Sequence, residues 1–138
     1  MTHVTDLDML IADLNDRPPA LAVDRAAEAL ALAAEAAEAL AEREDYDTAT
    51  LWWAAGTLSS AHRLLLPHTQ DDPPPLPPGP GPLADGSGRL NDVLQATVDA
   101  LDRAARATQE PQRLYALSRA ADLADKSRRA CVNARAAT

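Results

Sequence analysis

Aromatic residues are scarce in this chain of 138 residues: phenylalanine is absent, and two tryptophans and two tyrosines supply all the rings. Aromatics make up 3% of the sequence, whereas hydrophobic residues as a class make up 46%. Most of these are alanine and leucine, the strongest helix formers, and few are β-branched. The composition argues against a disordered chain and predicts an all-α fold.

Cysteine, histidine and the usual catalytic motifs are also scarce or missing. Cys131 is the only cysteine, which excludes an internal disulfide, and we expect it to be a small buried residue. The Glu-x-x-His motif of di-iron bundles does not occur, and one cysteine with three scattered histidines does not suit zinc. There is no glycine-rich phosphate loop and no Gly-x-Ser-x-Gly. We therefore expect no metal, no cofactor and no catalytic residue.

Long apolar runs are missing too. No uncharged apolar stretch reaches the ~18 residues of a membrane span, and residues 1–8 lack the basic and apolar regions of a secretion signal. Arginine outnumbers the single lysine, and alanine and proline are abundant, as in GC-rich bacterial genes. We expect a cytoplasmic protein of bacterial origin that does not contact the membrane.

Charge is distributed unevenly along the chain, whose net charge is −8. Residues 1–108 carry 7 basic and 18 acidic side chains, whereas residues 109–138 carry 6 basic and 3 acidic ones. Acidic residues at i and i+4 from basic ones, Asp122 with Lys126 and Asp125 with Arg129, should pair on the last helix. Arg128 and Arg135 then remain as unpaired cations. The acidic balance argues against nucleic acid as a partner, so binding through this helix is only a second alternative.

Helical spacing of apolar residues divides the chain into five expected helices. We predict a single domain: an antiparallel four-helix bundle made of two helical hairpins, with a short extra N-terminal helix. Residues 67–88 form a proline-rich linker between the hairpins. The expected helices span residues 5–15, 19–44, 47–66, 89–107 and 111–135.

The helix expected at 19–44 is apolar around most of its circumference, so it should be covered on more than one side. Its exposed edge is acidic and includes Glu35, Glu38 and Glu42. That edge is either simply solvated or a site for a basic partner. The basic last helix of a second copy is one such partner.

Trp52 and Trp53 are adjacent, so their side chains point about 100° apart on the helix expected at 47–66. We expect one to pack into the core and the other to border a groove or an interface. Together with Tyr46 and Tyr115 they supply most of the large rigid surface that protein interfaces use. Alternatively, Trp52, Trp53 and His62 line an apolar pocket in the bundle core, as in an enzyme or a carrier of small molecules.

The residues from Asp45-Tyr46-Asp47-Thr48-Ala49 to Ala61-His62-Arg63-Leu64-Leu65 resemble the core helix of HEPN-type helical bundles. The ribonuclease members of that family carry an arginine and, after four to six intervening residues, a histidine. The helices expected here contain no such motif, because the only histidine at that distance, His68 after Arg63, lies in the linker. The resemblance therefore implies a helical bundle and no activity.

The function that these features favour is a small noncatalytic module for protein interaction or assembly. The partner would be another protein or a second copy of the chain, giving a homodimer. The expected contact residues are Trp52, Trp53, Tyr46, Tyr115, Glu35, Glu38, Glu42, Arg128 and Arg135.

Overall fold

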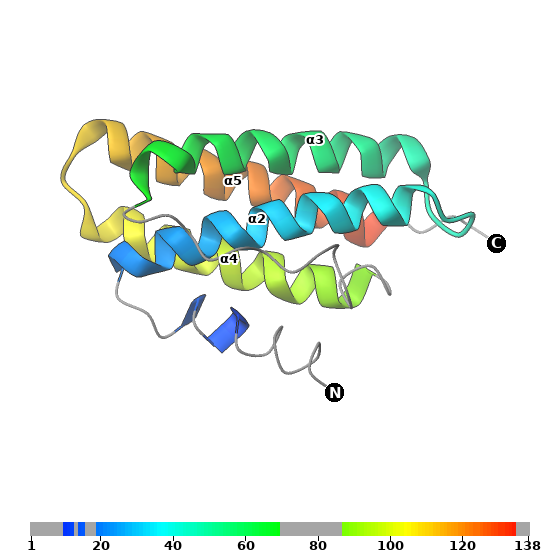
Figure 1. Ribbon diagram of the computed structural model, residues 1–138, viewed down its shortest axis with the longest axis horizontal. Helices are drawn as coiled ribbons and strands as arrows, with labels where there is room; N and C mark the ends of the chain where they lie inside the picture. The colour runs from blue at the N-terminus through cyan, green and yellow to red at the C-terminus, as the bar shows by residue number, and fades with distance from the viewer. Residues whose placement is uncertain (1–9, 13, 16–18, 70–86, 135–138) are drawn as a thin grey trace.

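A computed structural model describes residues 10–12, 14–15, 19–69 and 87–134 of the chain (Figure 1). Throughout these residues the ordered elements are helices, and no strand occurs among them. The predicted all-α class is therefore confirmed. Arg135 and most of the predicted N-terminal helix and proline-rich linker lie outside the described residues.

The four long helices begin and end within three residues of the predicted bounds. Proline stands at the first position of α2 and of α5, where its missing N–H costs no hydrogen bond. After α3 the chain tightens into a short 3-10 helix, η1, which contains Pro67. The elements are α2 (Pro19–Ala41), α3 (Thr48–Leu65), η1 (Leu66–His68), α4 (Ser87–Ala107) and α5 (Pro111–Asn133).

Each of the four long helices packs against two others: α2 and α5 both contact α3 and α4. The colours in Figure 1 show that α2 and α5 run in one direction and that α3 and α4 run in the other. Every packed pair is thus antiparallel. In Figure 1, α3 lies along the top of the bundle and α4 along the bottom, with α2 and α5 between them, each in contact with both.

Alanine and leucine fill the core. Leucines such as Leu30, Leu58 and Leu94 are fully buried, and alanines stand between them along every helix. Small side chains let helix axes approach to the short end of the usual ~8–10 Å. Residues 10–12 and 14–15 add a further layer on the α4 side, where Leu14 is fully buried and the Arg103 guanidinium donates to its carbonyl oxygen.

The turn between α2 and α3 is tied to the end of α5. The backbone N–H of Asp47 donates to the carbonyl oxygen of Ala134, at 2.6 Å. Within the turn, the Thr48 hydroxyl donates to the carbonyl oxygen of Ala41, at 2.9 Å. Asp47 is the N-cap of α3, but its carboxylate accepts from the Thr50 hydroxyl instead of capping a backbone N–H. These bonds hold the start of α3 in place.

Candidate protein interface

The exposed large apolar side chains of the described residues lie on two packed helices and on the 3-10 turn that follows one of them. Among the side chains that the structure describes, six large apolar ones are exposed, and all belong to α3, η1 or α5. Because α3 and α5 pack against each other, they form one surface, which we call the α3/α5 face. Its exposed apolar residues are Trp52, Trp53, Leu66, Leu114, Tyr115 and Val132.

Both tryptophans belong to this face, with exposed fractions of 48% for Trp52 and 51% for Trp53. The prediction that one of them packs into the core is wrong. The buried face of α3 centres on Leu58 and Leu65, and at about 100° per residue positions 52 and 53 fall on the two flanks of the opposite face. Neither ring can reach the core from there.

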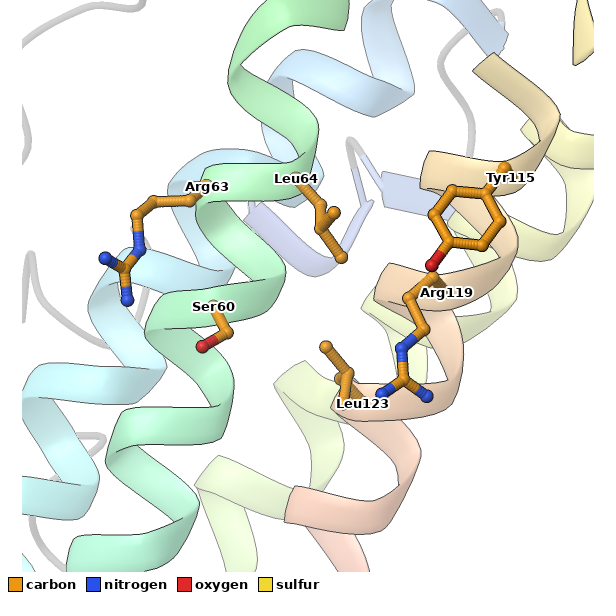
Figure 2. Close-up of a pocket in the computed structure, with 6 residues that line it drawn as sticks. All are labelled: Ser60, Arg63, Leu64, Tyr115, Arg119 and Leu123. Atoms are coloured by element: carbon orange, nitrogen blue, oxygen red, sulfur yellow. The ribbon is translucent and has the colours of Figure 1, made fainter. Parts of the chain in front are cut away.

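A groove runs between α3 and α5 (Figure 2). It has a volume of about 390 Å³, and Leu64 and Leu123 point into the gap from opposite helices. Arg63 extends away from α5, while Arg119 lies along α5. The groove therefore has an apolar floor with a cation on each rim. Its lining residues are Ser60, Arg63, Leu64, Tyr115, Arg119 and Leu123.

Helical spacing extends the groove wall toward Trp53. Trp53, Ser60 and Leu64 lie at i, i+7 and i+11 on α3, which places them along one stripe of that helix. On α5, Tyr115, Arg119 and Leu123 repeat every four residues in the same way. The leucines and arginines of the groove were not among the predicted contact residues, although the matching spacing on two helices is a signal that the sequence contains.

The charges at the groove are only partly neutralised within the protein. The carboxylate of Asp122 pairs with both Arg119, at 3.2 Å, and Lys126, at 3.1 Å. Arg63 is exposed and makes no hydrogen bond or ion pair with the described residues. The predicted pair of Asp125 with Arg129 is present at 2.9 Å, as is that of Asp122 with Lys126. Asp122 thus pairs with two cations of α5, and Arg63 on α3 has no ion pair with the described residues.

Arg128 is not the free cation that the sequence analysis expected. Its guanidinium donates to the Asp125 carboxylate, at 2.9 and 3.2 Å, and to the side-chain oxygen of Asn91 on α4, at 3.1 Å. The spacing of charges at i, i+4 does not indicate these partners, because Asp125 lies at i−3 and Asn91 lies on another helix. Arg128 therefore joins α5 to α4, while Arg135 lies outside the described residues.

Tyr46 also differs from its predicted role as a contact residue. It is only 6% exposed, and the Arg43 guanidinium covers its ring at 5.2 Å from the centroid. The ring closes the α2–α3 turn and does not offer a surface to a partner. Tyr115, by contrast, is 65% exposed.

The acidic edge of α2 is exposed over its C-terminal half. Glu35, Glu38 and Glu42 are all exposed, as expected. Earlier in the helix, Glu28 is only 8% exposed. Its carboxylate accepts hydrogen bonds from the Arg25 guanidinium, at 2.8 and 3.0 Å. The edge available to a partner thus begins at Glu35.

His62 lies between α3 and α2. Its Nδ1 donates to the carbonyl oxygen of Ala27 at 2.9 Å, and the side chain is half-buried. Neither His62 nor the two tryptophans line the groove of Figure 2. The Nδ1 atom of His62 is therefore engaged in a hydrogen bond that joins α3 to the backbone of α2.

Cys131 is fully buried near the end of α5, as the sequence analysis expected. Burial raises the pKa of its thiol to about 11, because the interior solvates a thiolate poorly. The reactive form is thus suppressed at neutral pH. Within the described residues, no group of three His, Cys, Asp or Glu side chains could hold a metal ion.

None of the described helices is both long and apolar enough to cross a membrane.

Comparison with known proteins finds no relative of this chain. The resemblance to HEPN-type bundles rests on the quoted residues alone. No protein-family model, no curated protein and no solved structure matches this chain.

Proposed function

We propose that this protein is a noncatalytic interaction module that binds another protein through its α3/α5 face. The observation that carries the proposal is the confinement of exposed large apolar side chains to α3, η1 and α5. In this proposal the chain is a two-hairpin antiparallel bundle acting as a rigid platform in a bacterial cytoplasm.

Exposed tryptophan supports a binding role better than a structural one. A tryptophan buries roughly 150–250 Å² when it is covered, and tryptophans are enriched among the residues that dominate binding energy. Trp52 and Trp53 leave about half of that surface to solvent, at 48% and 51% exposure. Contiguous apolar surface of this kind commonly marks an interface. The two rings are therefore the proposed anchors, with Tyr115 on α5 as a third contact.

The acidic edge at Glu35, Glu38 and Glu42 is a separate surface on α2. It offers three carboxylates on one exposed stripe and would suit a basic partner, including α5 of a second copy. A homodimer is therefore one assembly that the proposal allows, and the experiment must distinguish it from a hetero-complex.

Photo-crosslinking in the native cell tests this proposal. We would introduce p-benzoylphenylalanine in place of Trp53 or Leu114 on the α3/α5 face, and in place of Asp99, an exposed residue of α4, as the matched control. The proposal predicts a discrete protein adduct from positions 53 and 114 and none from position 99. An adduct of twice the chain mass identifies a homodimer. Absence of an adduct from both face positions, or equal adducts from all three, would contradict it.

A further inference from the structure

We infer that the groove between α3 and α5 receives an acidic amphipathic helix of a partner protein. The inference rests on the proposed function and names the chemistry of the partner. It follows from the shape of the groove, from the way this bundle already binds a helical segment of its own, and from the charges on the two rims.

The groove has the form of a helix-binding surface. Leu64 and Leu123 point into the space between two antiparallel helices, and such a space accepts a third helix by packing of side-chain ridges into grooves. The stripe of α3 that lines the groove at Ser60 and Leu64 continues beyond it to Trp53, and from Trp53 to Leu64 it is 11 residues long, or about 16 Å at 1.5 Å per residue. A partner helix of about three turns would cover it, with apolar anchors at i, i+3 or i+4, and i+7.

The protein already shows this mode of binding on its other side. Residues 10–12 and 14–15 are helical, and Leu10 and Ile11 pack against the core beside the fully buried Leu14. Arg103 of α4 fixes this segment by donating to the carbonyl oxygen of Leu14. A short apolar helical turn, held by an arginine at its edge, is thus accommodated by this bundle. The α3/α5 groove presents the same combination of leucine and arginine.

The charges on the rims select an acidic partner. Arg63 lacks a partner among the described residues, and Arg119 shares Asp122 with Lys126. This excess of positive charge lies on a chain whose net charge is −8. Two copies meeting groove to groove would bring like charges together, which is unfavourable, whereas carboxylates on both flanks of a docked helix would complement Arg63 and Arg119.

A library of displayed peptides tests the inference directly. Each peptide has 18 residues, with leucine fixed at a helical i, i+3, i+4, i+7 spacing and with Glu, Lys, Gln or Ala at the flanking positions. Peptides are selected on the whole protein. We expect glutamate to be enriched on both flanks, and lysine to replace it when the library is selected on the Arg63→Glu/Arg119→Glu variant.

Single charge reversals then measure the contact. The selected peptide should bind Arg63→Glu and Arg119→Glu about tenfold more weakly than the unmodified protein, because attraction is replaced by repulsion. Binding should change less than about twofold for Arg106→Glu, which reverses an exposed arginine of α4 away from the groove. Circular dichroism of each variant confirms that the helices are intact.

Distinct results overturn the inference and the proposed function. If selection shows no acidic preference, or if Arg63→Glu and Arg119→Glu leave affinity unchanged, the inference is wrong. Crosslinks from positions 53 and 114 would in that case still support the proposed function, and the partner would be a protein that does not present an acidic helix. If light scattering shows a dimer that Arg63→Glu dissociates, the groove is filled by a second copy, and the inference is again wrong.

Discussion

Gly56 offers a test in which stability and binding should change in opposite directions. It lies in the middle of α3, is exposed, and stands four residues after Trp52 and three after Trp53, which places it between them on the outer surface of the helix. A Cβ added there meets no atom within 4 Å. Glycine inside a helix costs roughly 0.5–1 kcal/mol relative to alanine, because more backbone entropy is lost on folding.

Gly56→Ala should therefore raise the free energy of unfolding by about 0.5–1 kcal/mol, and the melting temperature by about 2–5 °C for a chain of this size. Urea unfolding followed by circular dichroism measures the change. Gly88→Ala is the matched control: it also meets no atom within 4 Å but lies at the second position of α4, where the gain should be smaller.

The same substitution should weaken binding of the partner, because the added methyl group stands between the two proposed anchors where glycine lets a partner approach closely. Isothermal titration calorimetry measures the affinity for the free partner protein that the crosslinking experiment has identified. A loss of stability in Gly56→Ala would refute the helical geometry of α3 assumed here. A gain of stability with unchanged affinity would refute the placement of the interface across Trp52 and Trp53.

Three further predictions concern parts of the fold outside the proposed interface. Cys131, with its pKa raised to about 11, should be about one-thousandth thiolate at pH 8, so iodoacetamide should label the folded protein far more slowly than the urea-unfolded one; equal rates would show that the thiol is exposed. The pKa of Glu110 is lowered from 4.5 by hydrogen bonds from the backbone N–H groups of Gln112 and Arg113, so its contribution to stability is present above 4.5 and is lost as pH falls through the lower folded pKa. Glu110→Gln should accordingly reduce thermal stability at neutral pH and match the unmodified protein in strong acid; a difference that persists in acid would contradict the capping role. Arg128→Ala should lower the free energy of unfolding by about 1–2 kcal/mol, because it removes the hydrogen bonds to Asp125 and to Asn91; urea unfolding measures this, and an unchanged stability would mean that these bonds add nothing.

The helices could be predicted from the sequence because their determinants are local. Alanine and leucine set the propensity, Pro19 and Pro111 mark two starts, and apolar spacing identifies the buried faces. The end of α2 was placed three residues too late, at 44 instead of Ala41. The acidic turn residues after Ala41 oppose the negative C-terminal end of the helix dipole, which the spacing of apolar residues does not register.

The interface was harder to predict because it depends on which helices are neighbours. The aromatic residues Trp52, Trp53 and Tyr115 were recognised as candidates from their rarity, but their exposure depends on how α3 and α5 turn toward the core. The pairing of Leu64 with Leu123 across the groove joins residues 59 positions apart. Arg128 was misassigned for the same reason, since its partner Asn91 lies on another helix.

The affinity of Trp53→Ala for the partner captured by crosslinking tests the central claim most directly. If the α3/α5 face is the binding surface, this substitution should weaken binding by at least about 30-fold, as expected of an anchor worth about 2 kcal/mol or more, and Asp99→Ala on α4 should leave it unchanged. Equal affinity of the two variants for the partner would contradict the account.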